Sequence, residues 1–317
     1  MSLDAAARRR ALAVLWIALA NLLGGVSYPA QKAALEGLPP ATVTWIRNGT
    51  AALTLFLWVR FRGRSSGPWS RPDARRALVL GALAFALPMW LGIVGVRQAG
   101  ASSASILILL EPITIVAIAW LLLGERIGRL KLLSLVLGLL GALAIVLEGS
   151  EVGSLLPGER FRGNLVLVLH GVLWGCYTPL AKPLSERRDP FDLCLRVMLV
   201  ATAVLTVPAL LESPRWHAGA LGPALAWSVA LGLFVSFGST VLWLAALRDI
   251  PATSVAGFVF LQPLAGVLVG AGLMGEHLSP AMLLGGALIV LGVAIDAVVS
   301  AFARPRERVE APEGTSS

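Results

Sequence analysis

A carboxylic acid and a proline stand side by side in a long apolar stretch, at Glu111 and Pro112. Glu111 is about ten residues into the run 101–123, which would place it about 15 Å along a helix and near the middle of a membrane. A charge at that depth costs about 2.5–3.5 kcal/mol, so the position favours a neutral acid or a cationic partner. The pattern predicts that Glu111 binds a substrate ammonium group or exchanges a proton against it. The alternative is a neutral acid hydrogen-bonded between helices.

The same pattern returns in the second half of the chain as Gln262-Pro263. Pro112 and Pro263 would each break a helix locally and free a backbone carbonyl, as at many transporter midplane sites. Because Gln262 cannot ionise, a single protonation event would be asymmetric between the two halves. Pro29 and Pro179 are expected to kink an earlier helix in each half.

Other polar and aromatic residues within apolar runs could contact a substrate or carry a proton. A histidine can titrate near neutral pH, and an aromatic ring holds a cation by about 0.5–2 kcal/mol. The candidates are Asn21, Tyr28, His170, Trp174, Tyr177, Trp90 and Trp243. The alternatives are a histidine satisfied by a hydrogen bond and tryptophans that serve as apolar walls.

Four cations within or at the ends of apolar runs are candidates for gates or charge pairs. Lys32 and Lys182 each follow a proline by three residues, and Arg47 and Arg196 lie about six residues inside their runs. Long cationic side chains also reach the membrane surface from such depths, so simple anchoring is the alternative. The arginines could instead contact a substrate carboxylate.

The elements that position these residues follow from composition. Apolar residues make up 57% of 317 positions, charged residues only 14%, and the mean hydropathy is +0.80, whereas soluble domains carry about 25% charged residues. Runs long enough to cross a bilayer as helices occur at about 11–32, 41–60, 76–96, 101–123, 130–147, 163–184, 191–211, 222–246, 252–274 and 279–302. They are continuous rather than alternating, which excludes a β-barrel. The sequence predicts an all-α integral membrane protein with ten transmembrane helices.

The net charge of +8 follows the loops rather than a nucleic-acid-binding face. Nineteen of the 26 Lys and Arg residues fall on one set of alternate loops and five on the other. The rule that cytoplasmic loops are positive predicts both termini in the cytoplasm, in a multi-pass protein of the plasma or inner membrane. The polar tail 304–317 is expected to be disordered.

Polar and glycine landmarks of the second half repeat those of the first. An offset of 151 pairs Pro112 with Pro263, Gly124-Glu125 with Gly275-Glu276, and Gly141 with Gly292. An offset of 150 pairs Gly25 with Gly175, Pro29 with Pro179 and Lys32 with Lys182. The repeat predicts one five-helix unit in 1–150 and another in 151–303. Since five is odd, the second unit enters the membrane from the opposite side, as in inverted-repeat transporters.

These matched residues resemble the EamA-type members of the drug/metabolite transporter superfamily over residues 11–302. The landmarks include Trp174-Gly175, Glu111-Pro112, Gln262-Pro263 and Leu-Gly-Glu at 123–125, although Gly24-Gly25 stands where Trp-Gly is usual in the first repeat. The resemblance implies a carrier with a cavity between its halves that exports amino acids, amines or other metabolites. It leaves the particular substrate open.

The sequence therefore predicts a secondary transporter that works by alternating access, with proton exchange as an option. A channel for small solutes and a membrane-embedded enzyme are the alternatives. The enzyme is disfavoured because no metal or catalytic motif is present; Cys176 and Cys194 lie in apolar runs, and no Walker loop occurs. We expect no cofactor, no metal and no nucleic acid partner. Small residues such as Gly138, Gly141 and Gly285 would permit either helix packing or a homodimer.

Overall fold

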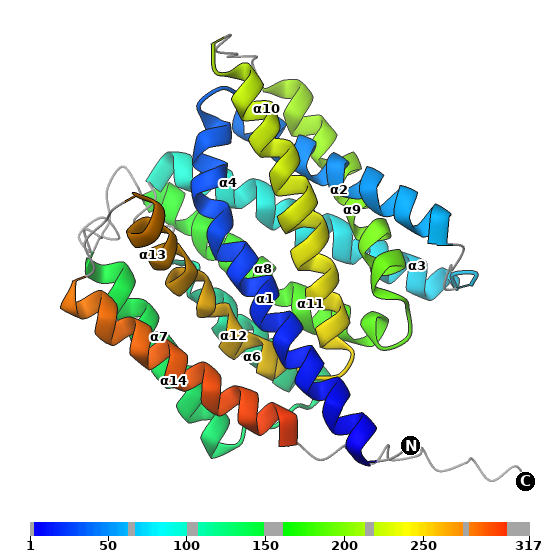
Figure 1. Ribbon diagram of the computed structural model, residues 1–317. Helices are drawn as coiled ribbons and strands as arrows, with labels where there is room; N and C mark the ends of the chain where they lie inside the picture. The colour runs from blue at the N-terminus through cyan, green and yellow to red at the C-terminus, as the bar shows by residue number, and fades with distance from the viewer. Residues whose placement is uncertain are drawn as a thin grey trace, which may run out of the picture.

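Helices form all the regular secondary structure in residues 3–62, 67–99, 107–148, 161–212, 219–274 and 279–302, the part of the chain that the computed structural model describes. Their bounds are α1 Leu3–Leu35, α2 Pro40–Arg62, α3 Arg71–Val79, η1 Leu80–Ala86, α4 Leu87–Ala99, α6 Leu110–Leu123, α7 Arg129–Glu148, α8 Phe161–Ser185, α9 Pro190–Leu211, α10 Leu221–Ala230, η3 Leu231–Ser239, α11 Thr240–Leu247, α12 Ala252–Val259, α13 Leu261–Met274 and α14 Pro280–Phe302. The beginning of α1 and the end of α14 lie at the same side of the bundle (Figure 1).

Within the described residues, seven helical stretches are long and apolar enough to cross a membrane. They are Ala7–Ser27, Arg71–Gly95, Arg129–Leu147, Phe161–Ser185, Pro190–Leu211, Leu221–Leu247 and Pro280–Ser300. Many leucines and aromatic residues on their outer faces are exposed, for example Leu210 at 80% and Leu121 at 68%. A water-soluble surface would not carry so many, whereas lipid accepts them. The chain is a multi-pass membrane protein.

Three of the ten expected spans fall outside that count, for two physical reasons. α2 is long enough, but it carries the polar residues Thr44, Arg47 and Asn48, all buried against other helices. The expected spans 101–123 and 252–274 are interrupted: a turn at 108–109 precedes α6, and Phe260 separates α12 from α13. Residues 101–106 lie outside the described residues.

Each interruption is placed by a proline. Pro112 and Pro263 are the third residues of α6 and α13. A proline fits the first turn of a helix, where its missing N–H is not needed, but not a helix interior. The helix therefore restarts two residues ahead of each proline, and Glu111 and Gln262 fall in the first turn after the break.

Two π-helical segments also occupy matching places, η1 before α4 and η3 before α11. A π turn widens the helix locally. At Gly81 in η1, an added Cβ would come within 2.8 Å of Val200 in α9. At Gly232 in η3, it would come within 2.7 Å of the Arg47 carbonyl in α2. Each π segment therefore packs tightly on the second helix of the other half.

α7 and α14 lie side by side and touch through their backbones (Figure 1). A Cβ on Gly141 would come within 2.5 Å of the Gly285 carbonyl oxygen, and one on Gly292 within 2.7 Å of the Ser134 carbonyl oxygen. Only glycine permits such an approach. Packing within the chain therefore uses these small residues, and they give no support to the homodimer that the sequence leaves open.

The first helix of each sequence half packs on the other half: α8 contacts α4 and α6, and α1 contacts α11 and α13. The end of α4 meets the beginning of α8, where a Cβ on Gly163 would come within 2.7 Å of the Ala99 nitrogen. The end of α11 meets the other end of α8, where Lys182 donates to the carbonyls of Leu247 and Ile250. Positions that correspond in the sequence repeat therefore lie at opposite ends of α8.

Candidate substrate site

Glu111 is buried at the helix interruption, with only 2% of the residue exposed. Its backbone N–H donates to the Ile108 carbonyl at 2.9 Å and closes the turn that precedes α6. Among the described residues, no side chain or backbone group forms a hydrogen bond or ion pair with its carboxyl group. Burial of a carboxyl group without a partner costs free energy, and binding of a cationic ligand or a proton would reduce that cost.

A strip of small residues on α8 seats the turn that carries Glu111. A Cβ on Gly175 would come within 2.8 Å of the Glu111 carbonyl oxygen and within 2.6 Å of Thr114, and one on Gly171 within 3.1 Å of the Leu107 carbonyl oxygen. The glycine of the Trp174-Gly175 pair is therefore required by the close approach of two backbones. Any larger residue at Gly175 would push the Glu111 turn away from α8.

Gln262, the counterpart of Glu111, has a partner. Its Nε2 donates to Oδ1 of Asn21 at 3.1 Å, and Nδ2 of Asn21 donates to the Ile17 carbonyl at 2.8 Å. A Cβ on Gly25 in α1 would collide with the backbone of Gln262, as at Gly175 in the other half. The two halves thus share a backbone arrangement, but only the first places an acid without a partner there.

Three candidates lie on a second face of α8, at positions i, i+4 and i+7. Nδ1 of His170 is 2.7 Å from the Pro88 carbonyl oxygen, which matches a histidine satisfied by a hydrogen bond. Trp174 and Tyr177 pack on Phe85, and their ring centroids lie 5.3 and 5.4 Å from the centroid of the Phe85 ring. The Tyr177 hydroxyl is buried and has no hydrogen-bond partner among the described residues.

This aromatic face points away from Glu111, because Tyr177 and Gly175 lie on nearly opposite sides of α8. Trp243 in α11 contacts α8 through a 3.2 Å hydrogen bond from its Nε1 to the Thr178 hydroxyl. Trp90 is 39% exposed and lies at the outer surface instead. Pro179 is buried inside α8. The side chains of Tyr28, Pro29 and Lys32 lie outside the described residues.

Arg47 and Arg196, which pair in the repeat at an offset of 149, have different surroundings. Arg47 is 8% exposed, and its Nε donates to the Ser236 hydroxyl in η3 at 3.0 Å. The Arg196 side chain is 42% exposed, lies 3.7 Å from Asp192 and stacks over Trp69. Arg47 therefore holds α2 to η3 inside the protein, whereas Arg196 belongs to a polar cluster near one end of the bundle.

Lys182 and Glu125 bind the ends of helices. Nζ of Lys182 donates to the carbonyls of Leu247 and Ile250 at 2.6 and 2.9 Å, at the end of α11. The Glu125 carboxylate accepts hydrogen bonds from the backbone N–H groups of Ala252 and Thr253 at 2.9 and 2.8 Å, at the start of α12. A cation at a helix C-terminus and an anion at an N-terminus both complement the helix dipole. Glu276, the counterpart of Glu125, lies outside the described residues.

A buried charge pair that we did not predict from the sequence joins α7, α12 and α14. Asp296 is fully buried, and its Oδ1 lies 3.9 Å from Nζ of Lys131, which also donates to the Ser254 hydroxyl. Ser300 donates to Ser254 at 2.8 Å and completes the cluster. Lys131 is one of the nineteen cations that the charge pattern assigns to the positive loops, whereas it is only 6% exposed. We name this group the Lys131–Asp296 pair.

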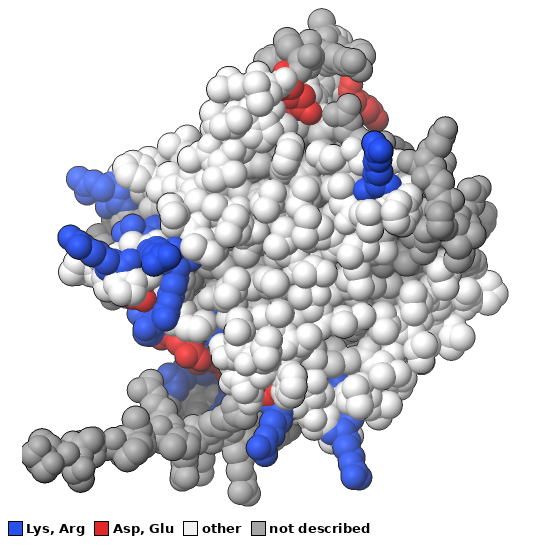
Figure 2. Space-filling model, turned by 180° about the vertical axis from the view of Figure 1, so that it is seen from behind, with Lys and Arg blue, Asp and Glu red and all other residues white. Residues whose placement is uncertain are grey.

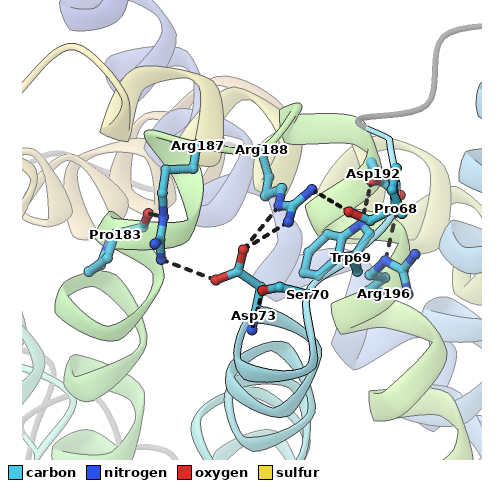
Figure 3. Close-up of polar contacts among 9 residues, drawn as sticks. All are labelled: Pro68, Trp69, Ser70, Asp73, Pro183, Arg187, Arg188, Asp192 and Arg196. Atoms are coloured by element: carbon cyan, nitrogen blue, oxygen red, sulfur yellow. Dashed lines mark hydrogen bonds and ion pairs between the residues drawn. The ribbon is translucent and has the colours of Figure 1, made fainter.

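A second polar group, which we name the Asp73 cluster, ties the start of α3 to the connection between α8 and α9 (Figure 3). Oδ2 of Asp73 accepts from Nη2 of Arg188 at 2.8 Å, and Oδ1 lies 3.2 Å from Nη2 of Arg187. The Trp69 ring lies between the guanidinium groups of Arg188 and Arg196, 4.8 and 4.2 Å from its centroid. The cluster fastens a segment of the first half to a segment of the second.

Histidine, cysteine and acidic side chains form no group of three that could hold a metal ion in the described ranges. The arrangement as a whole is helical and apolar, with an acid at a helix interruption and charges placed in pairs. That combination is typical of membrane carriers.

The comparisons with known proteins agree with this class. The sequence model of the EamA-like transporter family matches residues 11–147 and 161–296. The chain belongs to the EamA-like transporter family and is a transporter of that family.

The relatives are distant in sequence but cover nearly the whole chain. The uncharacterized transporter YoaV of Bacillus subtilis is 24% identical over 88% of this chain and 94% of its own length. A protein of Streptantibioticus cattleyicolor named a probable terminal-alkyne amino-acid exporter is 28% identical over 84% of this chain and 87% of its own. A crystal structure aligns with a TM-score of 0.78 at 20% identity, over 91% of this chain and 97% of that one, which shows a shared fold.

Proposed function

We propose that the chain is a secondary transporter that exports a small metabolite, such as an amino acid, an amine or a drug-like compound, by alternating access. In this proposal ten transmembrane helices form two five-helix repeats, 1–150 and 151–303, with opposite orientations in the cell membrane. The excess of Lys and Arg on one set of loops supports a cytoplasmic position for both termini.

The strongest structural support for inversion is the placement of equivalent positions at opposite ends of α8. The shared positions of η1 and η3, and of the interruptions before Glu111 and Gln262, also support a repeat. Two units of one plan with opposite orientations can exchange conformations, and such an exchange would open a site between them to alternate sides.

Cysteine labelling tests the inversion directly. Gln98 and Asp249 correspond under the offset of 151, so each would be changed to cysteine in a chain whose Cys176 and Cys194 are replaced by serine. We expect a membrane-impermeant thiol reagent to label one of the two in intact cells and the other only after the cells are opened. Labelling of both from the same side would contradict the inverted repeat.

The single observation that carries the proposed site is the buried carboxyl of Glu111, which has no partner in the described part of the chain. A carboxylate at this place would pair with a substrate ammonium group or take up a proton when the substrate leaves. Asn21, Gln262 and Trp243 are proposed to complete the site around Glu111, whereas Trp174 and Tyr177 are proposed to line a separate aromatic wall on the other face of α8. The name of the Streptantibioticus relative supports amino acids and amines as the first substrates to test.

Transport measurements on the purified protein in lipid vesicles test the function. We expect saturable counterflow of a radiolabelled amino acid or amine, faster when a pH gradient is imposed. A flux that ignores the gradient would remove proton exchange from the proposal. Flux without saturation or counterflow would indicate a channel, and chemical conversion of the labelled compound would indicate an enzyme.

Lys182, Arg47 and Arg196 are proposed to hold closed conformations at the two ends of the bundle. The Asp73 cluster supports this role, because it joins the two halves at the end where α3 begins. Any conformation that opens this end must separate Asp73 from Arg187 and Arg188.

A further inference from the structure

An open groove with a volume of about 690 Å³ lies between α3, α6 and α8, outside the proposed transport site. Its volume falls in the range of about 300–1,000 Å³ that is usual for small-molecule sites. The residues that line it are of two kinds, basic at one end and apolar along the rest. They are Arg71, Pro72, Arg75, Arg76, Val79, Leu80, Leu122, Leu123, Pro179, Leu180 and Pro183.

The basic end of the groove comes from the first turns of α3. Arg71 and Arg75 are one helical turn apart, and Arg76 also lines the groove. All three are exposed, and none forms an ion pair with another residue of the described part of the chain. Figure 2 shows Lys and Arg gathered on the side of the molecule where α3 lies. The groove therefore presents three positive charges in one place.

The one acid of α3 does not neutralise them. Asp73 is 6% exposed and held by Arg187 and Arg188, and no ion pair joins it to Arg71, Arg75 or Arg76. Its charge is used within the Asp73 cluster. The arginines of the groove thus have no anionic partner among the described residues and present their charge to an added anion.

The apolar walls of the groove continue outward into the lipid-facing surface. Leu122 is 57% exposed and Leu180 is 38% exposed, and both belong to helices of the bundle. A soluble anion would gain nothing from these walls. A molecule with an anionic headgroup and hydrocarbon chains would place its headgroup against the arginines and its chains along the leucines.

We propose that this groove binds an anionic phospholipid, with the phosphate held by Arg71, Arg75 and Arg76 and the upper acyl chains held by Val79, Leu122 and Leu180. Bidentate contacts to phosphate are the usual use of arginine rather than lysine. The proposal does not rest on transport, because the groove and its charges are independent of Glu111. A bound lipid would connect α3, α6 and α8, and hence both halves, at this end of the bundle.

Thermal unfolding of the purified chain in detergent tests the proposal. Short-chain phosphatidylglycerol is expected to raise the unfolding midpoint, whereas phosphatidylcholine of the same chain length is not. The variant Arg71→Gln/Arg75→Gln/Arg76→Gln should bind phosphatidylglycerol roughly 100-fold more weakly, since each cation near an anionic headgroup contributes substantially to binding. The matched control Arg8→Gln/Arg126→Gln/Arg129→Gln removes the same charge from exposed arginines outside the groove and should bind as the parent chain does.

A second variant keeps the three arginines and fills the apolar part of the groove with a larger side chain. Leu180→Trp should also weaken phosphatidylglycerol binding, and it remains informative if the triple variant does not fold. Equal losses in the groove and control variants, or equal stabilisation by phosphatidylcholine, would overturn the proposal. The same midpoint shift with inorganic phosphate alone would show a simple anion site. A change of oligomeric state in the groove variant without lipid would show an interface between copies of the chain.

Discussion

Replacing Glu111 by glutamine is expected to abolish proton-driven export and to weaken binding of an amine substrate by about 10- to 150-fold. The loss follows from removing a charge-assisted contact, which contributes about 1.5–3 kcal/mol. Glutamine keeps the shape of the side chain but can neither ionise nor exchange a proton. Substrate-induced thermal stabilisation and vesicle transport, measured with and without a pH gradient, are the readouts.

The chain itself indicates that this variant should fold. Gln262 occupies the equivalent first turn of α13, after the same kind of interruption and against the same kind of glycine. We therefore expect the unfolding midpoint of Glu111→Gln without ligand to be close to that of the parent chain, because one buried polar group replaces another of the same shape.

The matched control is Glu36→Gln, which removes an exposed acid in the turn after α1. It should leave binding and transport unchanged. Parent-like transport with an undiminished response to the pH gradient in Glu111→Gln would contradict the role of Glu111. A general loss of stability in that variant would instead indicate that the acid is a packing element.

The second large effect is expected at the Lys131–Asp296 pair. Removal of one member of a buried ion pair leaves the other charge buried and unpaired, which costs about 3–5 kcal/mol. Asp296→Ile and Lys131→Met should therefore each lower the unfolding midpoint strongly. The measurement is thermal or denaturant unfolding in detergent, followed by tryptophan fluorescence.

The double variant Lys131→Met/Asp296→Ile should recover most of the lost stability. Replacement of both charges by apolar residues of similar volume is often neutral or stabilising. Methionine and isoleucine are chosen as the replacements because Met282 and Ile145 stand at the positions equivalent to Lys131 and Asp296 under the offset of 151. Additive losses in the double variant would show that the two residues act separately. Normal stability with lost transport would assign the pair to the transport cycle.

The sequence was informative where membrane physics permits few solutions. Apolar runs predicted an all-helical membrane protein, and the resemblance indicated the family that the comparison then showed. The number of spans was harder to predict for two reasons. Two expected helices are interrupted ahead of Pro112 and Pro263, and buried polar residues lower the mean hydropathy of α2. Apolar composition alone does not reveal a helix break, and the prolines mark it only within a few residues.

The Lys131–Asp296 pair was missed because each residue was considered alone. Lys131 stands near the beginning of an apolar run, where a cation is typical of a loop, and Asp296 stands alone within the last apolar run. A signal was nonetheless present: both residues interrupt the repeat, since their counterparts are apolar. Two charges of opposite sign that depart together from an apolar pattern are expected to be partners. The hydrogen bonds of Glu125 and Lys182, by contrast, depend on helix ends that no local pattern specifies.

The polar contacts between distant segments have a consequence for biosynthesis. Three early residues contact partners that are translated much later. Arg47 donates a hydrogen bond to Ser236, Asp73 pairs with Arg187 and Arg188, and Glu125 accepts hydrogen bonds from Ala252 and Thr253. Each early residue leaves the ribosome well before its partner, so the N-terminal segments enter the bilayer before these contacts of their ionic groups can form. During translation these helices must stay near water, lipid headgroups or the insertion machinery, and a chain that stops before α12 would present such groups to cellular quality control.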